Sequence, residues 1–105
     1  MLLVVIESPY AGNIQGNTEY ARQALLDSLN RGEAPFASHL LYTQVLDDAT
    51  PEQRQRGMKA GFEFYSCADL CAVYTDRGIS SGMMRGIEQA EEYEVKVEYR
   101  QLYNL

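Results

Sequence analysis

The stretch Leu2-Leu3-Val4-Val5-Ile6-Glu7-Ser8-Pro9-Tyr10-Ala11-Gly12 decides the fold of this chain. Residues 2–6 are an unbroken aliphatic run rich in branched side chains, which is typical of a central strand buried on both faces. Residues 8–13 are turn-prone, so we expect the strand to end before them. A strand covered on both faces needs two further layers of structure, and this predicts an α/β domain.

The next segments predict a helix and a second strand. In residues 17–30 apolar side chains recur at intervals of three and four, with Asn17 or Thr18 as the expected cap and Gly32 as the stop. Residues 34–37 supply a short strand that carries Pro35 near its beginning. Residues 39–48 have no clear period, so we expect the end of that strand followed by a long loop.

A second helix is predicted over residues 51–67, because Thr50, Pro51 and Gln53 make a capping-box signature. Gly57 and Gly61 lie four apart on it, and each glycine costs roughly 1 kcal/mol relative to alanine. Close packing is the expected compensation. The sheet is the first candidate for that contact and a second subunit is the alternative.

The rest of the chain repeats the pattern. Residues 70–75 read as a buried strand, 76–82 as a turn, 83–92 as a helix and 95–99 as an edge strand. The alternation of strands and helices predicts one α/β domain over residues 1–105. Its sheet is expected to be mostly parallel, with four or five strands and helices on both faces.

Composition excludes several classes of protein. With 105 residues, 46% hydrophobic and 23% charged, the chain is expected to fold throughout as one unit. The net charge of -6 argues against a broad DNA- or RNA-binding surface. The apolar start has no basic leader and meets Glu7 and Pro9 too early for a signal peptide or a membrane span. We therefore expect a cytoplasmic protein with no nucleic-acid or membrane partner.

No metal or cofactor is predicted. Cys67 and Cys71 have only the distant His39 to join them, so a standard zinc site is excluded, and we expect both cysteines to be buried free thiols. Asp47 and Asp48 lack a third ligand and look like the solvated end of a loop.

Two loops are the expected ligand site. Residues 8–12 and 76–82 both follow strands, and ligands of parallel sheets collect at the carboxyl ends of strands, where the chain order reverses. Ser80, Ser81 and Gly82 stand directly before a helix, so free backbone amides and two hydroxyls can face an anion. The alternative is that the serines only cap the helix. Tyr10 offers a stacking surface for a base.

Other side chains near these loops have both a binding and a structural interpretation. Asp76 can accept hydrogen bonds from ribose or bond its own turn, and Arg77 can meet a phosphate or remain in solvent. His39, with Tyr42, can line the same mouth or serve the core. The predicted ligand-binding set is Ser8, Pro9, Tyr10, Ala11, Gly12, His39, Tyr42, Asp76, Arg77, Ser80, Ser81, Gly82 and Met83.

Three ordered blocks of the sequence resemble the nucleoside 2-deoxyribosyltransferase-like superfamily, in a small branch of it. The blocks are Ile6-Glu7-Ser8-Pro9-Tyr10-Ala11-Gly12, Ala34-Pro35-Phe36-Ala37-Ser38-His39-Leu40-Leu41-Tyr42-Thr43-Gln44 and Asp76-Arg77-Gly78-Ile79-Ser80-Ser81-Gly82-Met83. The resemblance implies a flavodoxin-like (Rossmann-like) three-layer sandwich that is often oligomeric. It also implies that nucleosides or nucleotides bind at the strand ends.

The same resemblance implies cleavage of an N-glycosidic bond by a glutamate nucleophile, placed four residues beyond the glycine of the Ser-x-Gly turn. Counting from Gly82, that position is Gly86, so the expected nucleophile is missing. Glu88 lies two residues further, about 200° around an ideal helix. Glu7 and Asp76 are carboxylates that do not match the family position. No catalytic residue is therefore assigned.

The sequence supports two main hypotheses about function. The first is a protein that binds, and in one version sequesters, a nucleotide or an ADP-ribose-like molecule, as a phage protein capturing a nucleotide immune signal would. The alternative is an enzyme, either a nucleoside 2-deoxyribosyltransferase or a deoxynucleotide N-glycosidase. An interaction module built on Met83 and Met84 is a third reading. A homo-oligomer is expected in each case.

Overall fold

The computed structural model describes residues 1–103 and contains one parallel sheet. Its strands are β1 (Leu3–Glu7), β2 (Ala34–Phe36), β3 (Leu70–Tyr74) and β4 (Lys96–Arg100). They lie in the order β2-β1-β3-β4, and every neighbouring pair is parallel. The predicted fold class is confirmed, with four strands, and β4 takes the expected edge position.

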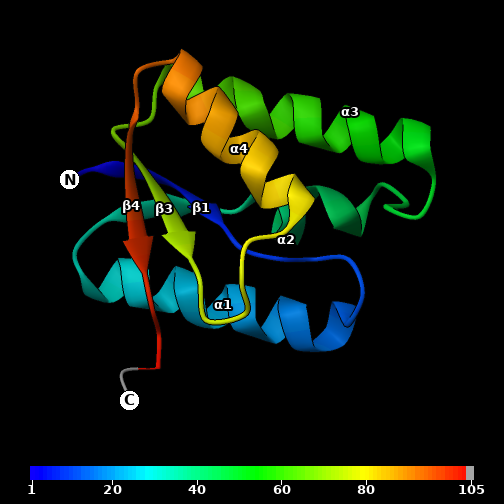
Figure 1. Cartoon of the computed structure of the whole chain (residues 1–105), viewed down its shortest axis with the longest axis horizontal. Helices are drawn as coiled ribbons and strands as arrows, with labels where there is room; N and C mark the ends of the chain where they lie inside the picture. The colour runs from blue at the N-terminus through cyan, green and yellow to red at the C-terminus, as the bar shows by residue number, and fades with distance from the viewer. Residues whose placement is uncertain (104–105) are drawn as a thin grey trace.

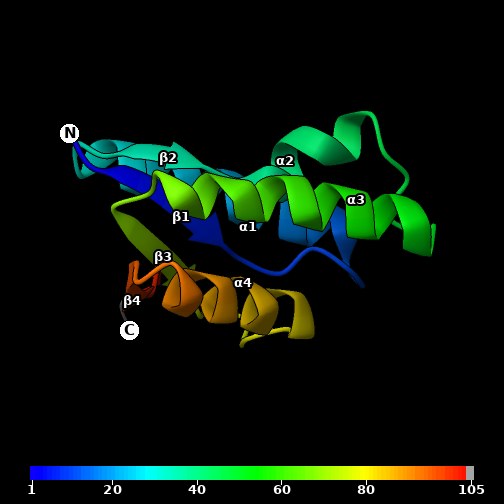
Figure 2. The ribbon, with the colours of Figure 1, turned by 90° about the horizontal axis from the view of Figure 1, so that it is seen from above.

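Helices cover both faces of the sheet, which gives three layers (Figures 1 and 2). On one face, α1 (Ile14–Asn30) packs its buried side chains against Val4 and Ile6. On the other face, α4 (Ser81–Glu92) packs against Val5 and the alternate side chains of β3, beside α3 (Pro51–Phe62). Successive side chains of a strand point to opposite faces, so the unbroken apolar run of β1 places side chains in the cores on both faces of the sheet.

Two helix starts differ from the prediction. Helix α1 begins one turn early because the Asn13 side chain accepts a hydrogen bond from the Gly16 amide. Asn17, predicted as a cap, instead donates to the carbonyl oxygens of Tyr10 and Ala11 and so holds the loop after β1. Asparagine is a favourable cap residue, so the sequence alone is compatible with a helix start at Asn13 or at Asn17. The path of the preceding loop decides for Asn13.

The capping box predicted at Thr50 does not form. The Thr50 side chain makes no cap bond to α3 and donates to Asp47. Gln53 accepts a hydrogen bond from the Asp47 amide. The polar groups expected to pair with each other therefore both bond Asp47, since the loop before α3 folds back over the helix start.

Residues 39–48 are more helical than predicted. They form α2 (Ser38–Leu41) and the 3-10 turn η1 (Tyr42–Gln44), and a second 3-10 turn, η2 (Glu63–Ser66), completes the segment predicted as the end of the second helix. Leu40 packs against the α1 core. The contact of this partly buried side chain and the Ser8–His39 hydrogen bond tie to the sheet side a segment too short to show a period in its sequence.

The glycines of α3 make room for α2 and η1 rather than for the sheet. A Cβ on Gly61 would lie 2.7 Å from Ser38 Cβ, whereas a Cβ on Gly57 would meet Leu46 Cδ1 at 3.4 Å, an ordinary contact. The predicted contact partner, the sheet, is therefore wrong. Of these two glycines, only Gly61 is required by the packing of the described residues.

Alanine substitutions at these two glycines should change stability in opposite directions. Gly61→Ala is expected to lower the free energy of unfolding by about 1–3 kcal/mol, because the new methyl group overpacks against Ser38. Gly57→Ala is expected to raise it by up to about 1 kcal/mol, since alanine favours the helix. Urea unfolding of both variants measures the difference, and equal effects at the two sites would contradict this packing.

The cysteines are free, and they differ in exposure. Cys71 is buried in β3, but Cys67 is exposed, so the prediction that both are buried is wrong for Cys67. Cys67 lies after the last 3-10 turn and its thiol donates to the Phe64 carbonyl oxygen. Within residues 1–103, no three metal-ligating side chains gather, and no helix there is long and apolar enough to span a membrane.

Candidate functional site

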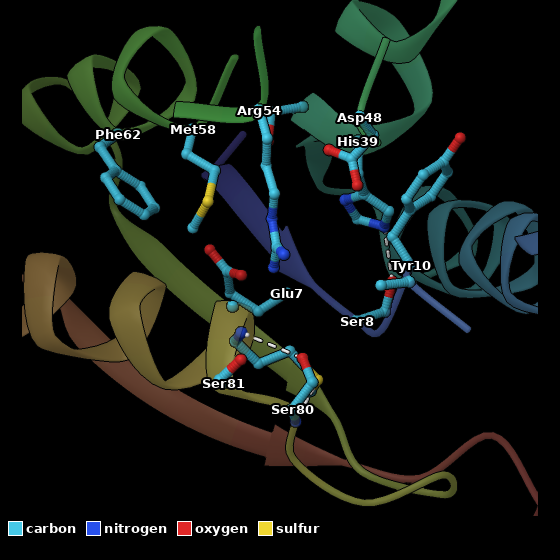
Figure 3. A pocket seen from close by; sticks show the side chains of 14 residues that line it. Glu7, Ser8, Tyr10, His39, Asp48, Arg54, Met58, Phe62, Ser80 and Ser81 are labelled. Atoms are coloured by element: carbon cyan, nitrogen blue, oxygen red, sulfur yellow. Dashed lines mark hydrogen bonds between the residues drawn. The ribbon is translucent and has the colours of Figure 1, made fainter. Parts of the chain in front are cut away.

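A cavity of about 200 Å³ opens at the carboxyl ends of β1 and β3. The chain leaves β1 toward β2 on one side and reaches β3 on the other, so this is where the order of the sheet reverses. The loop after β1, the start of α4, and side chains of α2 and α3 surround the opening (Figure 3). Its position is the one expected for a ligand of a doubly wound sheet.

Eight of the predicted binding residues lie together around this cavity. They are Ser8, Tyr10, Ala11, His39, Ser80, Ser81, Gly82 and Met83. Ser80 also caps α4, since its hydroxyl accepts a hydrogen bond from the Met83 amide at 3.2 Å. The capping interpretation of this serine is therefore confirmed, and the same side chain forms part of the cavity wall. Its contact with an anion stays a prediction.

Asp76 is not in the cavity lining. Its carboxylate accepts hydrogen bonds from the Tyr20 hydroxyl at 2.6 Å and from the amides of Leu102 and Tyr103. Burial alone would raise the pKa of Asp76, but these hydrogen bonds outweigh it and hold the pKa below its ordinary value. The ribose contact predicted for Asp76 does not fit this arrangement, in which the carboxylate fastens the segment after β4 to α1.

Four other predicted residues also lie outside the cavity lining. Arg77 reaches α1, where it donates to Asn17 Oδ1 at 3.2 Å and lies over the Tyr20 ring. Pro9 is buried in the loop, and Gly12 turns that loop with φ +94°. Tyr42 borders a smaller hollow between α2 and α3. The turn after β3 points toward α1, which the spacing of its residues could not reveal.

Six lining residues were missing from the predicted set. They are Glu7, Ser38, Asp48, Arg54, Met58 and Phe62. Arg54, Met58 and Phe62 lie four apart on α3 and so share one face of the helix. This spacing of four was the one sequence feature that could have indicated the three residues as lining a site. It does not distinguish a site from a core, because one cation and two apolar side chains on a helix face are also typical of a helix packed in a core.

Glu7 lies at the base of the cavity, where it ends β1. The Tyr65 hydroxyl donates to Glu7 Oε2 at 2.6 Å, and Met58 and Phe62 lie nearby (Figure 3). Burial raises the pKa of Glu7 to about 7, with the Tyr65 hydrogen bond opposing the shift. This carboxyl group is therefore poised between its charged and neutral forms near neutral pH.

A hydrogen bond joins Ser8 Oγ and His39 Nε2 at 2.7 Å on the opposite wall. The Tyr10 ring meets the imidazole edge-on, with 6.3 Å between ring centroids. Burial lowers the pKa of His39 to about 4, so the imidazole is neutral at pH 7. This wall presents an aromatic ring and neutral polar groups to a ligand.

Arg54 supplies positive charge to the cavity and faces the start of α4. Its guanidinium Nη2 lies 3.7 Å from the position that a Cβ on Gly82 would take. The first turn of a helix leaves backbone N–H groups without intrahelical acceptors, and in α4 Ser80 caps the N–H of Met83. The amides of Ser81 and Gly82 and the guanidinium thus converge on one side of the cavity, which suits an anion.

Solved structures of nucleoside-processing enzymes share this fold. A 2-deoxyribosyltransferase from Bacillus psychrosaccharolyticus matches with a TM-score of 0.67 at 16% identity, covering 98% of this chain and 74% of that one. A 2-desoxiribosyltransferase from Leishmania mexicana matches with a TM-score of 0.61 at 9% identity, covering 98% and 66%. The CMP N-glycosidase BcmB from Clostridium botulinum gives 0.56 and 13%, covering 94% and 71%.

These likenesses establish a nucleoside 2-deoxyribosyltransferase-like fold. No curated protein sequence matches the chain at a significant level. Residues 2–100 match the profile of a domain of unknown function, DUF7768, and the chain belongs to that family. The identities to the solved structures are too low to carry an activity across, so the function must be argued from the cavity itself.

Proposed function

We propose that this chain binds a nucleotide in the cavity at the carboxyl ends of β1 and β3. The observation that carries the proposal is the convergence of the Arg54 guanidinium and the start of α4 on one cavity wall. The chain has a net charge of -6, so an anionic ligand needs such a local concentration of donors. A phosphate group accepts hydrogen bonds from both the guanidinium and the backbone amides.

The opposite wall suits the remainder of a nucleotide. Tyr10 and His39 present ring surfaces, and the neutral imidazole keeps this wall free of charge. A heterocyclic base stacks on such rings and hydrogen-bonds to neutral polar groups. The cavity volume of about 200 Å³ is below the range of about 300–1,000 Å³ that is usual for pockets enclosing small molecules, so we expect it to hold a mononucleotide rather than the larger ADP-ribose-sized molecule.

Binding of this kind serves either of two functions. Sequestration of a nucleotide, for instance by a phage protein, needs only the binding groups of the two walls. The alternative is an enzyme that cleaves or exchanges the N-glycosidic bond, and the feature that favours it is the buried carboxyl of Glu7 inside the same cavity. The fold shared with deoxyribosyltransferases and a CMP N-glycosidase supports nucleotide binding under both versions.

The predicted homo-oligomer stays a proposal. Met83, named with Met84 as an interface residue, is buried against β3, whereas Met84 is 55% exposed on α4. If a second copy covers that side of α4, Met84→Glu should dissociate the oligomer. Light scattering of the purified chain measures the mass, and a monomer at high concentration excludes this version.

Removing the Arg54 guanidinium should weaken nucleotide binding. Arg54→Ala is expected to raise the Kd for nucleoside 5′-monophosphates about 10- to 100-fold, because a charge-assisted bond to phosphate contributes about 1.5–3 kcal/mol. The Kd for the corresponding nucleosides should change far less. Titration calorimetry with both sets of ligands measures the two effects.

Arg56→Ala is the matched control. Arg56 is an exposed residue of the same helix outside the cavity lining, and its loss changes the net charge by the same amount. Its Kd for monophosphates should stay within about twofold of the unsubstituted chain, as expected for a screened surface charge. If no monophosphate binds saturably to the unsubstituted chain, the proposed function is wrong.

A further inference from the structure

The side chain of Glu7 occupies the space that a side chain on Gly86 would need. A Cβ built on Gly86 would overlap the Glu7 carboxyl group, with both oxygens and the carboxyl carbon in collision. Gly86 lies within α4 and is buried. A glycine inside a helix destabilises it by about 1 kcal/mol relative to alanine. At position 86 this cost is offset by the room that the glycine leaves for the carboxyl group of Glu7, which comes from β1.

The strand fixes the direction of that carboxylate. Val4 and Ile6 face the α1 core, whereas Val5 faces the core under α4. Glu7 follows the same alternation and points to the α4 side, where a strand buried on both faces would ordinarily carry another apolar residue. A charged group at such a position is unfavourable unless the site uses it.

The hydrogen bonding of Glu7 leaves one oxygen for a ligand. Tyr65 donates to Oε2, and its ring is itself buried in the core under α4, so the bond holds the carboxyl group in one orientation. Within residues 1–103, no group hydrogen-bonds Oε1. The Glu7 side chain lines the cavity (Figure 3), so the arrangement orients one oxygen and leaves the other without a partner in this cavity-lining group.

We propose that Glu7 is the nucleophilic carboxylate of an N-glycoside-cleaving site and that Gly86 is the vacancy in α4 that admits it. This inference rests on the proposed nucleotide binding, which sets the sugar between the phosphate-binding groups and the base-binding wall. Tyr65 acts as a positioning residue. Burial supports the assignment, since it keeps the carboxylate poorly solvated and therefore more reactive.

The reaction balances with one water molecule. Glu7 Oε1 forms a bond to the anomeric carbon, and the bond from that carbon to the base nitrogen breaks with its electron pair going to the nitrogen. The base takes a proton from water and leaves. The resulting hydroxide attacks the anomeric carbon of the glycosyl ester, the ester C–O bond breaks, and the Glu7 carboxylate is restored.

The first test measures base release from the eight common ribo- and deoxyribonucleoside 5′-monophosphates by chromatography. The unsubstituted chain is expected to release base from at least one of them, and Glu7→Gln should lower that rate about a thousandfold or more while the Kd changes by less than about threefold. Glu88→Gln, on the exposed face of α4, is the control and should retain the full rate.

A second test locates the nucleophile without relying on a rate. Acid quenching during turnover, followed by mass spectrometry, should find a sugar phosphate on Glu7 in the peptide that trypsin releases by cutting after Arg22. An adduct on Ser8, or base release undiminished in Glu7→Gln, would overturn the assignment. If monophosphates bind but no base is released, this inference is wrong and the proposed binding stands. If nothing binds, both are wrong.

A swap of the two positions tests the vacancy itself. Gly86→Ala should abolish base release in the unsubstituted chain, because the new methyl group displaces the Glu7 carboxyl. In the Glu7→Gly background, adding Gly86→Glu should raise the rate of base release at least about tenfold, since the new side chain enters the space that the Glu7 side chain vacates and returns a carboxylate to the cavity. Circular dichroism confirms folding, and a folded swap variant with no recovery would count against the vacancy.

Tyr65→Phe separates positioning from mere packing. The titratable and charged groups around Glu7 are Tyr65, Cys71 of β3, and Arg54, His39 and Asp48, which line the same cavity. Because the Tyr65 hydrogen bond lowers the pKa of Glu7, its loss should move the acid limb of the pH–rate profile to higher pH. A reduced rate with an unmoved profile would contradict the positioning role.

Discussion

Glu7→Gln and His39→Gln are expected to change the pH dependence of stability in opposite directions. Between pH 4.5 and 6.5, the Glu7→Gln variant should become more stable as the pH rises. The His39→Gln variant should become less stable over the same range. The unsubstituted chain should show a nearly flat response from these two groups, because their contributions cancel there.

The signs follow from which state binds protons more tightly. Burial raises the pKa of Glu7 from 4.5 to about 7, so the folded state holds this proton more tightly and stability is lost as the pH rises from 4.5 to 7. Burial lowers the pKa of His39 from 6.5 to about 4, so stability is lost as the pH falls from 6.5 to 4. Each shift corresponds to about 3 kcal/mol.

Urea unfolding of both variants between pH 4 and 8 measures these slopes. Glu33 and Asp76 have lowered pKa values in the folded state, so each makes the chain more stable as the pH rises out of the acid range. This contribution is the same in both variants and cancels when their stabilities are subtracted. At pH 7 Glu7→Gln should be more stable than the unsubstituted chain by about 3 kcal/mol, a stability gain typical of replacing a functional group. Parallel slopes in the two variants would refute the predicted environments.

Arg100→Met should destabilise the chain by about 3–5 kcal/mol. The guanidinium of Arg100 is buried, with 3% of its side chain exposed, and bonds both carboxyl oxygens of Glu33 at 2.7 and 2.9 Å. It also donates to Glu98 and to the Tyr74 hydroxyl. Its removal leaves the Glu33 carboxylate, 11% exposed, without its cation.

Arg31→Met is the matched control, because Arg31 pairs with Asp27 at the surface, with side chains 44% and 31% exposed. Its loss should cost less than about 1 kcal/mol. The double variant Arg100→Met with Glu33→Gln should recover much of the lost stability, since it removes the stranded charge. Thermal and urea unfolding measure all three variants, and a double variant no more stable than Arg100→Met would contradict the charge argument.

Local sequence pattern was sufficient to predict the four strands and the three long helices, and it predicted eight of the residues that line the cavity. The aliphatic run of β1 and the strand-helix alternation predicted the parallel sheet, since each local pattern requires only its own neighbours. Of the predicted loop pair at residues 8–12 and 76–82, the cavity is lined by Ser8, Tyr10 and Ala11 of the first loop and by residues 80–82 of the second, whereas Asp76 and Arg77 lie outside it. The segment around His39 was missed as a helix because it is held by tertiary contacts, such as those of Leu40 and His39, and has no period of its own.

The contents of the cavity were decided by contacts between distant segments. Asp76 looked like a ligand residue from its place after a strand, yet it bonds α1 and the segment after β4. Arg54 was not among the predicted site residues, yet its guanidinium reaches the start of α4. The sequence around Asp76 or Arg54 does not show where either side chain points, because this depends on how the helices pack against the sheet.

The run Leu2-Leu3-Val4-Val5-Ile6-Glu7 by itself determined a buried central strand, and the alternation of strands and helices after it determined the parallel sheet, since these follow from polarity and period. The ligand site at the carboxyl end of that strand stays a prediction. Gly86 by itself reads only as the absence of a nucleophile. The tertiary structure alone decided that Glu7 fills the space beside it, because β1 and α4 meet through packing across the sheet. Whether a carboxylate is present in the site therefore depends on that contact and not on the residue at one position of a motif.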